Sequence, residues 1–185
     1  MGVPYSVFKL IKEIVDTCRI CRTWTRKAPD VELAIRVCIR FNQCVQVDLM
    51  FYEETFRGAV QVHIILNLVD ECIRWSCAVR VDSKDAECLI EAIKLHWCYV
   101  HGPPQMMIWD GERAMVDSYA LSWASRNNMM LISRPKHKKA WVIERHNEVL
   151  RVSMHKTQSQ LAAEGLIVSG DIVLAGGVFS NNALL

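Results

Sequence analysis

The chain has 185 residues, which is enough for one domain with a hydrophobic core and short for two. Its 51% hydrophobic and 23% charged residues exclude a disordered or fibrous chain. With 22 basic and 20 acidic residues the net charge is only +2, so an argument for nucleic-acid binding must rest on local clusters of charge.

Residues 1–39 form a mixed, basic segment that contains the pair Cys18 and Cys21. Two cysteines at this spacing are half of a tetrahedral zinc site, which needs a second cysteine or histidine pair. The nearest histidine, His63, lies in a predicted strand. We therefore expect either two ordinary thiols or the remnant of an incomplete zinc-binding region, and we do not expect zinc to bind to this chain.

Three strands are predicted next. Apolar and polar residues alternate along 41–52, which predicts a strand with two different faces and with Asp48 in its middle. After a turn at 53–58, the segments 60–69 and 73–81 are rich in β-branched residues and predict two further strands. Three consecutive strands with short connections predict an antiparallel meander.

The apolar residues then change to helical spacing. They predict a helix whose first turn Asp82 or Ser83 can cap, and which His101-Gly102-Pro103-Pro104 ends. The remaining predicted elements are a strand at 106–109 that ends on Asp110-Gly111, a helix between 112 and 127, a strand at 129–132, a basic loop at 134–139 and a helix from 140 to about 156.

This order of elements predicts an α/β domain over residues 40–157. Its mixed sheet is expected to be antiparallel at first and parallel later, with helices on both faces. Residues 158–185 contain several glycines and are expected to form a C-terminal helical tail rather than a second domain.

The eight cysteines and the apolar segments indicate a compartment. Several cysteines lie in apolar patterns, where a thiol acts as a small hydrophobic side chain, so no disulfide framework is expected. The longest apolar stretch, 62–69, is too short to cross a bilayer, and charged residues near the N-terminus argue against a secretory signal. We expect a reducing, intracellular location and no membrane partner.

Three carboxylates are placed where a sheet of this kind can assemble a site. Asp48 lies mid-strand, where a buried charge needs compensation; Asp110 ends a strand at the carboxyl edge; Glu144 lies in the first turn of the last helix. The structural alternatives are a solvated strand end, an Asp-Gly turn and a helix-dipole interaction. If the first and fourth strands are neighbours, the three could converge and bind two Mg²⁺ ions for phosphodiester chemistry.

In order and local sequence these residues resemble the catalytic cores of retroviral and gypsy-type retrotransposon integrases, which have a ribonuclease H-like fold. The resemblance spans roughly 15–157. It rests on Val45-Gln46-Val47-Asp48-Leu49, Trp109-Asp110-Gly111 and Glu144-Arg145-His146-Asn147-Glu148-Val149-Leu150-Arg151, with support from Val69-Asp70, His101-Gly102-Pro103-Pro104 and the Cys18 and Cys21 pair.

The resemblance implies a DDE-type integrase, a polynucleotidyl transferase that trims the 3′ ends of element DNA and joins them to a target. It implies a five-stranded mixed sheet, three strands antiparallel and then parallel, in which Asp48, Asp110 and Glu144 are catalytic. The three would hold Mg²⁺ or Mn²⁺ as a two-metal site. The implied partner is double-stranded DNA, bound by a homo-oligomer in the nucleus.

Five further residues are candidates for DNA binding. Asn147 and Arg151 follow the glutamate by three and seven positions, on the same side of the helix, and the resemblance assigns this side to DNA. The basic loop contributes Lys136, Lys138 and Lys139, whose charges suit phosphates. A solvated helix face and a solvated connection are the alternatives.

The chain also departs from the family. Only 33 residues separate Asp110 from Glu144, slightly fewer than usual. The histidines of the N-terminal zinc finger are absent, and no C-terminal DNA-binding barrel is evident. We expect a fragment or remnant of a longer polyprotein. The alternatives are another ribonuclease H-like nuclease or transposase, and a decayed or domesticated integrase domain that binds nucleic acid or protein without catalysis.

Overall fold

The computed structural model describes residues 10, 13–14, 17–18, 37–56, 59–109, 115, 117–134 and 141–183. The elements in chain order are β1 (Cys44–Phe56), β2 (Ala59–Asp70), β3 (Ser76–Val81), α3 (Ala86–Ile93), the π-helical turn η1 (Lys94–Cys98), α4 (Tyr99–His101), β4 (Met106–Trp109), α5 (Ser118–Arg126), β5 (Met130–Ser133), α6 (Trp141–Ala163) and α7 (Gly170–Ala183). Within these described ranges, no helix is long and apolar enough to cross a membrane.

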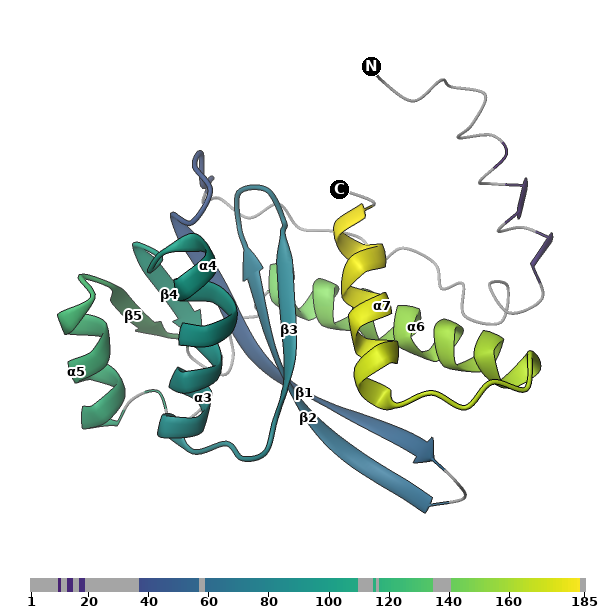
Figure 1. Ribbon diagram of the computed structural model, residues 1–185. Coiled ribbons are helices and arrows are strands. Elements are labelled where there is room, and N and C mark those ends of the chain that lie inside the picture. The colour runs from purple at the N-terminus through teal and green to yellow at the C-terminus, as the bar shows by residue number, and fades with distance from the viewer. Residues whose placement is uncertain are drawn as a thin grey trace.

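The five strands form one mixed sheet in the order β3-β2-β1-β4-β5 (Figure 1). β1 pairs with β2, and β2 with β3, in antiparallel fashion. β1 pairs with β4, and β4 with β5, in parallel fashion. The predicted mixed sheet is confirmed. β1 is its central strand, so the first and fourth strands are neighbours, as convergence of the carboxylates requires.

Helices cover both faces of the sheet, as predicted. On one face α3 and α5 pack over a core that includes Val45 and Val47 of β1. On the other face α6 and α7 pack over Met50 and Tyr52 of the same strand, and Figure 1 shows the two helix pairs on opposite sides. Because successive strand residues point to opposite faces, the even-numbered residues of β1, including Asp48, face α6.

β1 and β2 form a longer hairpin than predicted, because residues 53–56 of the turn expected at 53–58 belong to β1 instead. β1 continues to Phe56 and stays paired with β2 along this length. The polar end of β1 is stabilised as a strand by a buried contact with β2. Glu54 is buried beside His63, whose Nε2 lies 2.7 Å from the glutamate Oε2. A buried carboxylate with such a partner is compatible with a strand.

The helical segment after β3 ends as predicted but begins differently. Gly102, with a φ of 79°, follows α4 and ends the segment, because glycine adopts this left-handed conformation without strain. The expectation that Asp82 or Ser83 caps α3 is wrong. The residue that precedes the helix is Asp85, and the Ser83 hydroxyl donates a hydrogen bond (2.9 Å) to its carboxylate.

α6 begins close to its predicted start and continues to Ala163, well beyond 156. α7 packs against α6 and β3. Leu150 and Met154 of α6 share one buried cluster with Val173 and Leu174 of α7. The C-terminal residues therefore supply a second helix on the face of the sheet that carries Asp48.

Candidate active site

Asp48 lies on β1 with its carboxylate held between two hydrogen-bond donors. Its Oδ2 accepts a hydrogen bond of 2.7 Å from Nδ2 of Asn147 on α6, and its Oδ1 accepts one of 2.9 Å from the backbone N–H of Leu49. The side chain is partly buried. Hydrogen bonds to a charged group contribute about 1.5–3 kcal/mol each, so the orientation of this carboxylate is well defined.

Asn147 is itself oriented by Asn67, the residue of β2 that stands opposite Asp48 in the antiparallel register. Nδ2 of Asn67 donates a 2.7 Å hydrogen bond to Oδ1 of Asn147. Both amides are buried. Because the oxygen of Asn147 accepts from Asn67, its N–H group is directed at Asp48, and the three side chains form one chain of hydrogen bonds across β2, β1 and α6.

The first turn of α6 is fixed to the same strand by Gln46. Oε1 of Gln46 accepts a hydrogen bond of 3.1 Å from the backbone N–H of Ile143, one of the donors that a helix start leaves unpaired. Glu144 is the next residue. It lies in the first turn, as predicted, and precedes Asn147 by three residues, so the two occupy neighbouring positions on the helix surface. The Glu144 side chain is exposed.

The carboxyl end of β4 lies beside the same part of β1. The parallel register ends with Trp109 opposite Val47, one residue before Asp48. Asp110 follows Trp109 in the chain and lies outside the described residues, as do Lys136, Lys138, Lys139 and Cys21. These residues keep the status of sequence predictions.

The other candidates from the sequence are described. Arg151 is exposed on α6, one turn after Asn147. Both polar atoms of the Asn147 side chain are engaged within the protein, and its DNA contact stays a prediction. Cys18 is partly buried near the N-terminus, away from the sheet strands in sequence.

Burial keeps His146, a residue of α6 near the site, uncharged. Burial, together with the smaller effect of the nearby guanidinium groups of Arg74 and Arg145, lowers the pKa of His146 from 6.5 to about 4. His146 is therefore neutral at pH 7. It adds no positive charge beside the helix turn that carries Glu144.

Two polar residues of the site were not predicted, Gln46 and Asn67. Each had a signal in the sequence, since each is a polar residue inside a strand pattern, and Asn67 interrupts the longest apolar stretch. The hydrogen bonding of Asn67 is incomplete, because its buried Oδ1 has no hydrogen-bond partner among the described residues.

The residues near Asp48 include oxygen ligands of the kind that hard divalent cations prefer. They are the partly buried carboxylate of Asp48, the exposed carboxylate of Glu144 in the first turn of α6, and the amide oxygen of Asn67, which has no hydrogen-bond partner among the described residues. Among the described residues, a set of three metal-ligand atoms within 4.8 Å of one another occurs elsewhere, at Cys38, Cys44 and Glu71.

Comparison with protein-family models gave no match, and comparison with curated protein sequences gave none. Solved structures do match. Two forms of the HTLV-2 integrase catalytic core in complex with magnesium, one trimeric and one dimeric, each superpose with a TM-score of 0.63 at 12% identity. They match over 78% of this chain, and over 87% and 88% of their own chains respectively.

A third match is the integrase of a simian T-cell lymphotropic virus intasome in complex with the PP2A regulatory subunit B56 gamma. It has a TM-score of 0.63 and 15% identity, and covers 93% of this chain and 59% of its own. Identities this low carry the fold and not the chemistry. The chain has the ribonuclease H-like α/β fold of retroviral integrase catalytic cores.

Proposed function

We propose that this chain is the core of a DDE-type polynucleotidyl transferase that processes DNA 3′ ends and joins them to target DNA. One observation carries the proposal: Asp48, on the central strand, is hydrogen-bonded by Asn147 of α6, one turn after Glu144. The β1 and β4 register supports it, because extending the pairing of Val47 with Trp109 by one residue would set Asp110 beside Asp48.

In this proposal Asp48, Asp110 and Glu144 hold two Mg²⁺ or Mn²⁺ ions. Bound ions of this kind lower the pKa of an attacking water or hydroxyl and offset charge on the leaving oxygen. The HTLV-2 core, which has the same fold, is described in complex with magnesium. Asp48 and Glu144, the two members of this set that the structure describes, have the carboxylate oxygens that such an ion prefers as ligands.

The task of the remaining residues is to keep these ligands in position before DNA arrives. Asn147 holds the Asp48 carboxylate in one orientation, and Gln46 fixes the helix turn that carries Glu144. Polar groups oriented in advance need little reorganisation during the reaction, which is where most electrostatic catalysis arises.

The proposed substrate is double-stranded DNA, from the element ends and the target, of a retrotransposon whose protein acts in the nucleus. Arg151 is exposed one turn beyond Asn147, where a guanidinium can contact a phosphate. The similar integrases are described as a dimer, a trimer and an intasome, which supports a homo-oligomer as the active form.

A strand-transfer assay with Mn²⁺ tests the proposal. The substitutions Asp48→Asn, Asp110→Asn and Glu144→Gln keep side-chain shape and remove a charged ligand. Groups that only support metal ligands change activity 10–100-fold, so loss of a ligand should cost about 100-fold or more. Glu87→Gln, an exposed change at the start of α3 on the opposite face, should retain full activity.

Equal residual activity in the native chain and in all three ligand variants would overturn the proposed enzymatic function. That result would leave a domain that binds nucleic acid or protein without catalysis. Circular dichroism of each variant shows that loss of activity is not loss of folding.

A further inference from the structure

Three metal-binding side chains meet beside the start of β1, although they come from three separate segments. They are Cys38, Cys44 and Glu71, and their ligand atoms all lie within 4.8 Å of one another. Sγ of Cys38 lies 3.2 Å from Oε2 of Glu71. The backbone N–H of Glu71 donates a 2.9 Å hydrogen bond to the carbonyl of Cys44, which fixes these two residues side by side.

The backbone around Glu71 is held by its neighbour Asp70, which is fully buried. Oδ1 of Asp70 accepts hydrogen bonds from the N–H groups of Cys72 (2.9 Å) and Ile73 (2.8 Å), and Oδ2 accepts one from Asn42 (2.8 Å). Because both carboxylate oxygens of Asp70 accept these hydrogen bonds, we assign the role of metal ligand to Glu71 and not to Asp70. They also bring the segment before β1 against the turn after β2.

The cluster lies at the boundary between the buried core and the surface. Cys44 is buried, whereas Cys38 and Glu71 are partly buried. Two of the three ligands are therefore accessible from solvent, and the third is shielded from it. Thiolate sulfur selects zinc-class cations over magnesium, and three protein ligands with water in the fourth position are a common zinc arrangement.

We propose that Cys38, Cys44 and Glu71 bind one zinc-class divalent cation. On binding, each thiol gives its proton to solvent and its sulfur forms a bond to the ion, while the carboxylate binds through an oxygen. Two protons are released for each ion, and no oxidation occurs. The site uses neither the carboxylates of the proposed active site nor the Cys18 and Cys21 pair. It departs from the expectation from the sequence that zinc does not bind to this chain.

The site is linked to the helix that carries Glu144. The carboxylate of Glu71 also accepts a hydrogen bond from Nε2 of Gln46, and Oε1 of Gln46 accepts one from the first turn of α6 at Ile143. Binding of an ion at Glu71 therefore stabilises the position of this turn through one intervening side chain. This link is separate from the chemistry proposed for Asp48.

Titration of the reduced chain with Co²⁺, followed by displacement with Zn²⁺, tests the proposal. Cobalt bound by thiolates gives an intense sulfur-to-metal charge-transfer absorption, whose strength follows the number of thiolates. We expect one cobalt ion per chain to give the sulfur absorption, at a strength typical of two thiolates, and its affinity to rise with pH because two protons leave. Glu87→Gln, which changes an exposed carboxylate on α3, should give the same sulfur absorption as the native chain.

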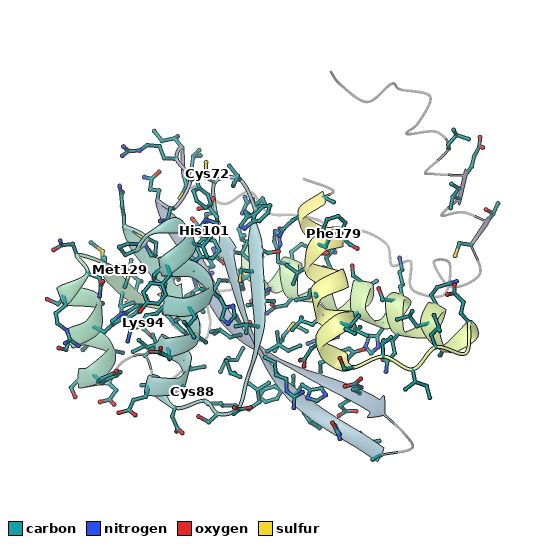
Figure 2. All side chains as sticks on the ribbon, viewed as in Figure 1. Cys72, Cys88, Lys94, His101, Met129 and Phe179 are labelled. Carbon is teal, nitrogen blue, oxygen red and sulfur yellow. The ribbon has the colours of Figure 1, made fainter. Side chains whose placement is uncertain are left out.

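Cys38→Ser is the main variant, because this side chain is only partly buried and the fold should survive its replacement. It should halve the charge-transfer absorption and weaken zinc binding about 100-fold, and Glu71→Gln should weaken binding with the absorption intact. Cys88→Ser and Cys98→Ser are the matched controls. Both thiols pack on the α3 face, and Figure 2 shows Cys88 at the far end of the domain from Cys72, the residue after Glu71.

Three results would overturn the proposal. The first is cobalt binding without a sulfur absorption. The second is zinc affinity that is unchanged in Cys38→Ser. The third is loss of binding in a Cys18→Ser, Cys21→Ser double variant while Cys38→Ser binds normally, which would assign the ion to the N-terminal pair.

Discussion

Asn147 of α6, the helix that carries Glu144, is hydrogen-bonded to Asp48 on β1. Its amide nitrogen donates to Asp48, and its amide oxygen accepts from Asn67. Replacing it with alanine removes the donor to Asp48 and leaves the buried amide of Asn67 without its acceptor. Leaving a buried polar group unpaired costs about 1–3 kcal/mol, so Asn147→Ala should lower the free energy of unfolding by that amount.

Urea denaturation at pH 7 measures this loss. Gln160→Ala is the control on the same helix, because Gln160 is exposed and its side chain hydrogen-bonds Glu164, one turn later in the chain. Such contacts contribute a few tenths of a kcal/mol. If both variants unfold at the same urea concentration, Asn147 does not hold the site together.

His146 makes the stability of the molecule depend on pH. Its pKa is about 4 in the folded chain, lowered from 6.5 by burial and by Arg74 and Arg145. The unfolded chain therefore binds a proton that the folded chain does not between pH 6.5 and about 4, so stability falls as pH falls through this window. His146→Gln, which cannot be protonated, should show a shallower loss of stability from pH 7 to pH 4.5.

The measurement is the difference in free energy of unfolding between the native chain and the variant at these two pH values. His96→Gln is the control, since His96 is exposed on η1. An identical pH dependence of the native chain and His146→Gln would show that His146 is as readily protonated as an exposed histidine.

At the scale of elements, the close approach of α7 to α6 depends on Gly177. A Cβ atom at Gly177 would lie 3.0 Å from Cδ1 of Leu150 and 3.1 Å from Cγ of Met154, whereas one at Gly176 would meet only Thr157, at 4.0 Å. Leu150 and Met154 are both buried and have little room to move. The two neighbouring glycines therefore provide a matched pair for alanine substitution.

Gly176→Ala should stabilise the chain, because alanine is favoured over glycine in a helix by about 0.8–1.0 kcal/mol. Gly177→Ala gains the same preference but is overpacked, at a cost of about 1–3 kcal/mol. We expect the Gly177 variant to have the lower melting temperature of the two. The reverse order would show that α7 does not pack on α6 as described.

The kinds and order of the elements followed from local sequence, whereas several of their ends did not. A change from period two to helical spacing identified strands and helices correctly. The ends of β1 and α6 depend on packing partners in other elements: Glu54 needs His63 of the next strand, and α6 packs beside α7. No local pattern contains that information.

The same limit applies to the candidate site. Asp48 could be identified because a charged residue in mid-strand needs compensation. Its surroundings could not, because Asn67 meets Asn147 across 80 residues and Gln46 meets Ile143 across 97. These contacts exist only once the sheet and α6 are packed together.

At the scale of the whole molecule, the low net charge of +2 means that DNA affinity has to come from a local cluster. Replacing Lys136, Lys138 and Lys139 with glutamine should weaken DNA binding and flatten its salt dependence. The slope of log K against log salt should fall by about 0.9 for each phosphate that the variant no longer neutralises. Fluorescence anisotropy over a range of salt concentrations measures the slope.

Replacing Lys84 and Lys94 with glutamine provides the control. Lys84 lies over the ring of Phe51, and Lys94 pairs with Glu91. We expect the native slope for this control. A native slope in the triple variant as well would mean that residues 134–139 are only a solvated connection.

Anomalous diffraction from crystals of the chain soaked in Mn²⁺ tests most directly whether the three carboxylates share a metal site. We predict manganese bound to the carboxylates of Asp48 and Asp110, with Glu144 directed at the same position and metal–oxygen distances near those of Mg²⁺, about 2.0–2.1 Å. Manganese that binds elsewhere while Asp48 keeps only its contact with Asn147, or a Glu144 side chain that faces away from Asp48, would contradict this prediction.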